Sequence, residues 1–182
     1  MKLHLGCGSR KLKGYIHVDL ANYDHIEVTT SIDDLHMFKD ETVDEIYCSH
    51  AFEYFDRTTA NAVLSEWHRV LKIGAKLFLT VPDFDRLLEV YHLTGSLKNI
   101  LGPLFGKWAL NDKYIFHKTT WNRADLTNAL LTAKFQNVEY FDPISFLNEI
   151  DASYDDYSLS FFPHMDRNGI PISLSLTAKK ID

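Results

Sequence analysis

The chain has few cysteines, no long apolar run and no signal-peptide pattern, and each lack excludes a class of protein. Its only two cysteines among 182 residues, Cys7 and Cys48, exclude a disulfide-built secreted domain and favour free thiols in a reducing compartment. No apolar run approaches the length of a membrane span, and Met1 leads directly into a strand pattern. We therefore expect a cytoplasmic protein that is not attached to a membrane.

An excess of basic residues and a metal-ligand pattern are also missing. The net charge of −6 argues against a broad nucleic-acid surface, although residues 10–13 form a locally basic turn. Nine histidines are present, but no close spacing of histidines or cysteines suggests a metal site. The sequence has no repeat, and its 46% hydrophobic residues are typical of one soluble enzyme domain over residues 1–182.

The most informative motif lies at the start of the chain. Residues 2–8 form a strand pattern that runs into a glycine loop, and residues 15–19 form a second strand that ends in Asp19. Gly6 and Gly8 lack a Cβ atom, so the turn can take positive φ and a ligand can approach bare backbone. A carboxylate at the end of the second strand can accept both hydroxyls of a ribose. Together these features predict half of a nucleoside-cofactor site.

The spacing within this motif favours a cofactor without phosphates. A dinucleotide site usually has the pattern G-x-G-x-x-G at the start of a full helix, whereas Lys11 occupies the third glycine position here. Residues 9–14 can span roughly 20 Å, enough to return along a short strand but too short for a helical crossover. A helix that could bind a pyrophosphate is therefore at most about one turn long, which favours S-adenosylmethionine over NAD.

Strand and helix patterns alternate along the rest of the chain. Strands are predicted at 2–6, 15–20, 25–30, 43–49, 75–81, 136–141 and 171–179. Helices are predicted at 58–71, capped by Asp56 or Thr58 and stopped by Gly74, and at 83–94 and 122–134. This alternation predicts a parallel sheet that is covered on both faces.

Five segments in order carry a resemblance to a known family: residues 5–8, 14–19, 43–53, 69–74 and 77–83. Over residues 2–141 the chain resembles the class I S-adenosylmethionine-dependent methyltransferases, most closely the small predicted methyltransferases with a short first crossover. The resemblance implies an α/β, Rossmann-like, doubly wound fold with a mostly parallel seven-stranded sheet, an antiparallel edge strand and a shortened first helix. It also implies methyl transfer from S-adenosylmethionine to a small molecule with a hydroxyl or amine, such as a sugar or related metabolite.

The cofactor contacts are expected in the loops that follow the first four strands, because ligands bind at the carboxyl ends of parallel strands. With the resemblance, this places cofactor contacts at Leu5, Gly6, Cys7, Gly8, Asp19, Leu20, Ser31, Ile32, Asp33, Ser49 and His50. Asp33 can accept from the adenine amino group, and a solvated loop is the alternative. Many class I enzymes carry an acid where this chain has His4, and a neutral imidazole can accept a hydrogen bond instead.

A catalytic base is needed only when the acceptor is a weak nucleophile, since the methyl group of the cofactor is already activated. The candidates are His117, His50 and Asp83, and His117 is the first choice. Asp83 has the alternative role of capping its own helix. His50 is expected to line the pocket, where Glu53 either fixes its tautomer or contacts the amino group of the cofactor. The alternative is that Glu53 starts a polar helix end and His50 is a loop histidine with satisfied hydrogen bonds.

Two segments, at about 95–121 and 142–170, fall outside the predicted scaffold. They combine glycine and proline with aromatic residues, and the second also holds Asp151, Tyr154, Asp155, Asp156 and His164. Insertions of this length are usually lids or binding loops, so we expect them to select the substrate. The short first crossover also leaves part of one sheet face bare, which predicts either a homodimer or an insertion folded over that face.

Two other functions remain open from the sequence. One is a regulatory or partner protein that binds S-adenosylmethionine without catalysis, since His4 replaces the acid and the base is unassigned. The other is an NAD-dependent oxidoreductase on the same topology, which the missing third glycine disfavours.

Overall fold

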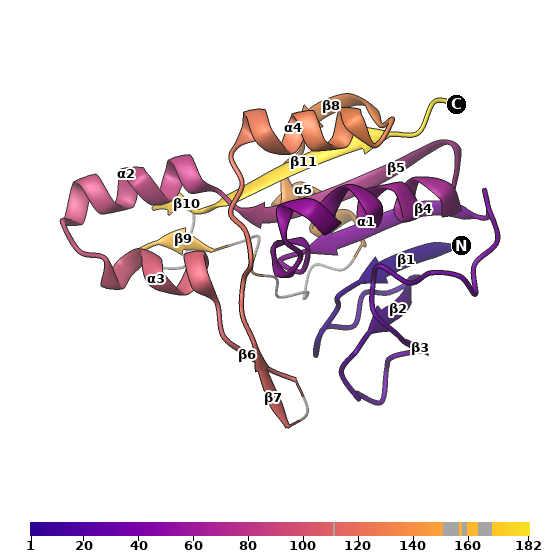
Figure 1. The fold of residues 1–182 in the computed structure, drawn as a ribbon, viewed down its shortest axis with the longest axis horizontal. Helices are drawn as coiled ribbons and strands as arrows, with labels where there is room; N and C mark the ends of the chain where they lie inside the picture. Colours follow the sequence, from indigo (N-terminus) through magenta and orange to yellow (C-terminus); the bar gives the residue numbers. More distant parts are fainter. Residues whose placement is uncertain (111, 151–156, 158–159, 164–168) are drawn as a thin grey trace.

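The central sheet has seven strands in the order β3-β2-β1-β4-β5-β11-β8 (Figure 1). The computed structural model describes residues 1–110, 112–150, 157, 160–163 and 169–182. The strands are β1 (Lys2–Leu5), β2 (Ile16–Asp19), β3 (Val28–Thr29), β4 (Val43–Ser49), β5 (Leu71–Pro82), β8 (Gln136–Tyr140) and β11 (Ser173–Lys179). All pairs are parallel except those of β11, which is antiparallel to β5 and β8. The predicted fold class is confirmed, with the antiparallel strand one position in from the edge strand β8.

Helices α1 (Arg57–Val70) and α4 (Arg123–Thr132) lie on one face of the sheet (Figure 1). Asp56 caps α1 by accepting from the N–H groups of Thr58 and Thr59, as the sequence predicts. The inner face of α1 buries Ala60, Val63, Leu64, Trp67 and Val70 in the main core. Helix α2 (Phe84–Thr94) follows β5 and packs against α3 (Lys98–Phe105) beyond the end of the sheet.

Gly74 does not end α1, which corrects the sequence expectation. The helix ends at Val70, and Leu71 is already extended with φ −68° and ψ 140°. Gly74 lies within β5 at φ +84°, where its N–H donates to the Lys180 carbonyl at 2.7 Å. The pairing of β4 with β5 is irregular at this point, so β5 starts earlier than predicted. The predicted strand at 25–30 is also shorter, because only Val28 and Thr29 pair with β2.

The first crossover has turns in place of a helix. Arg10 N–H donates to the Cys7 carbonyl, and Leu12 N–H donates to Nε2 of His17 at 2.8 Å. Side-chain and turn hydrogen bonds therefore satisfy amides that a helix would otherwise pair. Residues 6–15 contain no helix, so the shortened first helix that the sequence predicts, of at most one turn, is absent.

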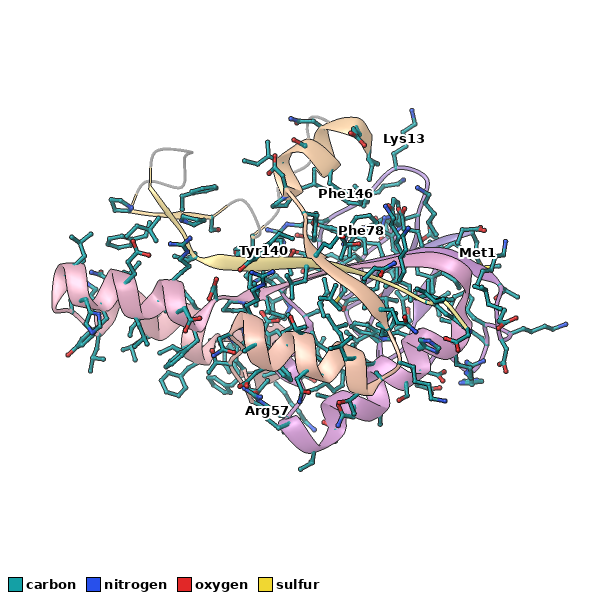
Figure 2. All side chains as sticks on the ribbon, turned by 90° about the horizontal axis from the view of Figure 1, so that it is seen from above. Met1, Lys13, Arg57, Phe78, Tyr140 and Phe146 are labelled. Atoms are coloured by element: carbon teal, nitrogen blue, oxygen red, sulfur yellow. The ribbon has the colours of Figure 1, made fainter. Side chains whose placement is uncertain are left out.

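Helix α5 (Pro143–Ile150), within the second insertion, covers the other face of the sheet (Figure 2). The Phe146 ring lies 5.1 Å from the Tyr47 ring and 4.4 Å from the Phe78 ring, and Leu147 is buried beside them. The sequence offered an insertion or a homodimer as the cover of this face. The structure shows the insertion, and the homodimer is an alternative that a single chain does not test.

The two insertions form small elements that the sequence patterns did not predict. The first contains α3 and a hairpin of β6 (Trp108–Leu110) and β7 (Lys113–Ile115). The second contains α5 and the pair β9 (Phe161–Phe162) and β10 (Ile170–Pro171). Asp151, Tyr154, Asp155, Asp156 and His164 lie outside the described residues. None of the helices in the described part combines the length and apolar content needed to cross a membrane.

Candidate functional site

A cavity of about 430 Å³ opens at the carboxyl ends of the parallel strands, within the size range of ligand pockets. Loops after β1, β2, β3 and β4 form its base, and both insertions contribute to its walls. Among the residues that line it are most of the predicted ones: Gly6, Cys7, Gly8, Asp19, Leu20, Ser31, Ile32, Ser49, His50 and His117. The fold therefore gathers segments that are more than 100 residues apart in the sequence.

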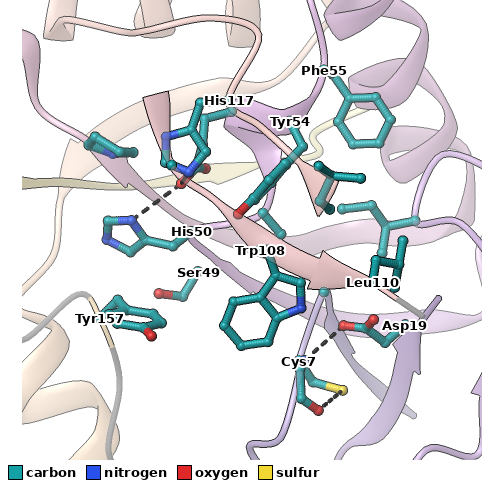
Figure 3. A pocket seen from close by; sticks show the side chains of 18 of the residues that line it. Cys7, Asp19, Ser49, His50, Tyr54, Phe55, Trp108, Leu110, His117 and Tyr157 are labelled. Atoms are coloured by element: carbon teal, nitrogen blue, oxygen red, sulfur yellow. Dashed lines mark hydrogen bonds and ion pairs between the residues drawn. The ribbon is translucent and has the colours of Figure 1, made fainter. Parts of the chain in front are cut away.

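Glycine is favoured at the two positions of the first loop for different structural reasons. Gly6 has φ +65°, and a Cβ atom there would lie 2.3 Å from the Cβ of Ala51. It thus allows the loop after β1 to pack tightly against the loop after β4. Gly8 has φ +55°, and a Cβ there would lie 3.6 Å from the ring of Trp108, which lies over this loop (Figure 3). The predicted contact between a ligand and bare backbone is therefore assigned to Gly8, because Ala51 occupies the space beside Gly6.

Asp19 is held against the glycine loop. Its Oδ2 accepts from the Gly8 N–H at 2.7 Å, and its Oδ1 accepts from the Ala21 N–H at 2.7 Å. Each carboxylate oxygen can accept a further hydrogen bond, so both can still face a ligand in the cavity that Asp19 lines. The carboxylate is thus fixed in position before any ligand arrives.

Three predicted site residues do not line the cavity. Leu5 is fully buried in the core below it, and Asp33 is exposed and accepts from the Ser31 hydroxyl. Asp83 caps α2 by accepting from the Asp85 N–H at 3.1 Å, and burial raises the pKa of its carboxyl. Asp33 therefore lies in a solvated loop and Asp83 is a helix cap, as the alternatives from the sequence stated.

His4 and Cys7 are buried polar groups at the base of the cavity. The His4 ring packs among aromatic rings, with centroids 5.4 Å from Tyr47 and 5.6 Å from His17. Burial, together with the nearby Asp19 carboxylate, raises the pKa of the Cys7 thiol to about 12. Cys7 is therefore a neutral thiol, and neither cysteine is in a disulfide.

Glu53 is a cavity residue whose role the sequence pattern left open. It lies in the short 3-10 helix η1 (Phe52–Tyr54), and its side chain is fully buried. Its Oε1 lies 3.3 Å from Nδ1 of His50 and 3.7 Å from Nε2 of His117. The spacing of His50 and Glu53, just after the carboxyl end of β4, is the sequence signal for this cluster.

The lining residues that were not predicted as site residues include Arg10, Tyr54, Trp108 and Tyr157. The Arg10 guanidinium lies 4.3 Å from the Tyr157 ring centroid, and the Tyr54 ring meets His117 edge-on at 4.8 Å. Trp108 and Tyr157 come from the two insertions, whose aromatic content was the only signal for them. No group of three or more His, Cys, Asp or Glu side chains suited to a metal ion occurs in the described part of the chain.

A family model described as "Methyltransferase domain" matches residues 9–79, which include the end of the glycine loop, Asp19 and the β4 loop. Among solved structures, the chain is similar to an S-adenosylmethionine-dependent methyltransferase from Methanosarcina mazei. That similarity has a TM-score of 0.60 at 18% identity and covers 99% of this chain and 92% of the other. The chain has the class I methyltransferase fold.

Two further structures share this class I methyltransferase fold. An S-adenosylmethionine-dependent methyltransferase from Archaeoglobus fulgidus has a TM-score of 0.56 at 16% identity, covering 98% of this chain and 85% of that one. The 1,6-didemethyltoxoflavin-N1-methyltransferase of Burkholderia thailandensis, solved with S-adenosylhomocysteine, has a TM-score of 0.57 at 12% identity, covering 100% and 71%. No curated protein matches the sequence. The predicted resemblance to class I methyltransferases is confirmed.

The residues of this cavity fit the cofactor that a class I methyltransferase fold implies. A Cβ is absent at Gly8, where the backbone faces the cavity, and a fixed carboxylate stands beside it at Asp19. Leu20 in the loop after β2 and Ile32 in the loop after β3 add apolar surface to the lining. This combination suits a nucleoside with a vicinal diol and a flat base.

Proposed function

We propose that the chain binds S-adenosylmethionine in this cavity and transfers a methyl group to a small molecule with a hydroxyl or amine. The observation that carries the proposal is the Asp19 carboxylate, which two backbone N–H groups hold against the glycine loop. That placement suits the ribose hydroxyls, with Gly8 beneath the ligand and Ile32 against its base. The cofactor, when bound, supplies an activated methyl group.

The protein's contribution is to orient the acceptor and exclude water. Tyr54, Trp108 and Tyr157 give the cavity aromatic walls, and two of them belong to the insertions. A site closed by such side chains favours a small acceptor over a macromolecule. In this proposal the chain is a single domain and the insertions at about 95–121 and 142–170 act as its lid.

The crossover geometry supports S-adenosylmethionine over NAD. Residues 6–15 contain turns and no helix, so the described chain offers no helix N-terminus to a pyrophosphate at this loop. The dinucleotide alternative therefore lacks its main phosphate contact.

Product formation tests this proposal. The purified protein is incubated with S-adenosylmethionine and pools of small alcohols, phenols and amines, and S-adenosylhomocysteine is measured by mass spectrometry. We expect product that depends on an acceptor and falls strongly in Asp19→Ala. Cofactor binding without product in any pool would instead support a regulatory protein, and tighter binding of NADH than of S-adenosylmethionine would support an oxidoreductase.

A further inference from the structure

Glu53 presents a charge problem inside the cavity wall. Its side chain has no exposed surface, and neither carboxylate oxygen has a hydrogen-bond donor within normal distance among the described residues. A buried carboxylate is strongly unfavourable unless a proton or a cation compensates it. The polar groups nearest to it are the rings of His50 and His117.

The environment of His117 assigns protons to both of its ring nitrogens. Nδ1 lies 2.9 Å from the carbonyl oxygen of Pro103, which can only accept a hydrogen bond, so Nδ1 carries a proton. Nε2 lies 3.7 Å from Oε1 of Glu53, and a lone pair there would face a carboxylate. The ring is also held tightly, since a Cβ at Gly106 would lie 2.4 Å from Nε2. Both nitrogens therefore face acceptors, which suits an imidazolium cation.

The environment of His50 favours a neutral ring with one available lone pair. Nδ1 lies 3.3 Å from Oε1 of Glu53, an ion-pair distance without hydrogen-bond geometry, so the charge of the carboxylate favours a proton on Nδ1. Nε2 lies 2.9 Å from the Ser173 hydroxyl, whose single proton can also go to the Tyr157 carbonyl at 3.4 Å, which leaves the Nε2 lone pair available. His50 lines the cavity, and its side chain is 14% exposed.

We propose that His50 is the catalytic base, that Glu53 positions it, and that His117 is the imidazolium that compensates the Glu53 charge. This inference rests on the proposed methyl transfer. As the bond between the acceptor atom and the methyl carbon forms, the bond from that carbon to sulfur breaks and its electron pair stays on sulfur. The acceptor's own proton passes to Nε2 of His50. The acceptor is therefore a group that must lose a proton, such as an alcohol or phenol, and not a tertiary amine or thioether.

The other groups around the two rings are compatible with this arrangement. Tyr54 meets His117 edge-on, and Tyr157 meets His50 edge-on with centroids 6.1 Å apart. Burial raises the pKa of the Tyr54 phenol, so it stays neutral. The Arg10 guanidinium stacks on Tyr157, and Lys107 is a second cation in the cavity lining. Within the described chain, Glu53 is thus the carboxylate that both imidazoles contact.

Nitrogen-15 NMR of the imidazole rings, in the protein without cofactor near neutral pH, tests the assignment. Resonances are assigned with the variants His50→Asn and His117→Asn. We expect both nitrogens of His117 to be protonated and His50 to carry its proton on Nδ1. In Glu53→Gln the second proton of His117 is lost. Glu27→Gln is the matched control, because Glu27 contacts Nδ1 of His17 at 2.8 Å and its removal should affect that ring alone.

Wild-type spectra keep the test decisive even if Glu53→Gln does not fold. A neutral His117, or a proton on Nε2 of His50, would overturn the proposal. A second readout is modification by diethyl pyrocarbonate, which attacks unprotonated imidazole nitrogen: His50 should react faster than His117, and the reverse order would contradict the assignment. Neither measurement uses the cofactor. A wrong proton assignment is therefore distinguishable from a failure to bind S-adenosylmethionine, which calorimetry measures separately.

Discussion

Gly6 shows how one residue can satisfy a backbone and a packing requirement together. From the sequence, its missing Cβ was interpreted as space for a ligand. The structure fills that space with Ala51, whose Cβ lies 2.3 Å from where a Gly6 Cβ would be. The glycine motif was predictable from the sequence, but the partner that requires it was not, because Ala51 lies 45 residues away.

Substituting Gly6 by Ala is therefore expected to destabilise the fold itself. The new methyl group would overlap Ala51 at a residue with positive φ, and overpacking of this kind costs about 1–3 kcal/mol. Urea unfolding measures the loss. Gly14→Ala is the matched control, because Gly14 also has positive φ (+85°) but nothing lies within 4 Å of its Cβ position. Equal losses in the two variants would refute the packing explanation.

Helices with clear caps were predictable at the scale of elements, whereas the short elements were not. Asp56 and the apolar face of α1 are local signals, so the helix was found within one residue at each end. The β6–β7 hairpin, α3 and α5 have 3 to 8 residues per element, too few for a periodic pattern. Their positions depend on distant contacts, such as that of Phe146 with Tyr47.

A pH-sensitive ion pair within α1 also contacts the segment before β4. Glu66 accepts from Nε and Nη2 of Arg69, both at 2.7 Å, and from the Leu35 N–H at 3.1 Å. The Arg69 hydrogen bonds lower the pKa of Glu66 below its ordinary value. A lowered carboxyl pKa contributes stability that is present above the unfolded-state pKa and is lost as pH falls through the folded-state pKa.

Glu66→Gln is thus expected to lower the free energy of unfolding by about 1–2 kcal/mol at neutral pH. The difference from wild type should shrink as pH falls below about 4. Urea unfolding across this pH range measures it. Glu89→Gln is the control, because Glu89 pairs with Arg86 at the same spacing but is half exposed, so its effect should stay below about 0.5 kcal/mol. A pH-independent Glu66 effect would contradict the account.

Helix α5 substitutes for the cover that a first crossover helix would give. Phe146→Ala should destabilise the protein by about 1–3 kcal/mol, since its ring packs on Tyr47 and Phe78. Phe116→Ala, at a half-exposed ring, is the control and should change stability by about 0.5 kcal/mol or less. Thermal or urea unfolding measures both changes. Equal losses of stability would contradict the conclusion that α5 covers this sheet face.

Light scattering at micromolar concentration tests the same cover in another way. We expect a monomeric wild type, because α5 already buries the apolar surface of this sheet face. We also expect self-association to increase in Phe146→Ala. A stable wild-type dimer would instead confirm the homodimer that the sequence suggested.

For the whole molecule, the fold class and the cofactor side of the cavity follow from local motifs, while the acceptor side does not. Gly8, Asp19, Ile32 and His50 line the cavity as predicted, because loops at the carboxyl ends of parallel strands converge. Trp108 and Tyr157 reach it from insertions whose paths no local pattern encodes. The proposed methyl transfer depends most on which ligand binds at the Asp19 side of this cavity.

Calorimetric titration with S-adenosylmethionine and S-adenosylhomocysteine tests that claim most directly. We predict binding by the wild type that Asp19→Ala weakens by about 1.5–3 kcal/mol, or roughly 10- to 150-fold in Kd. Asp33→Ala should leave Kd unchanged, because Asp33 is exposed and outside the cavity lining. Thermal unfolding of the unliganded variants checks that the glycine loop remains folded. Absence of binding by the wild type, or equal loss in both variants, would contradict the account.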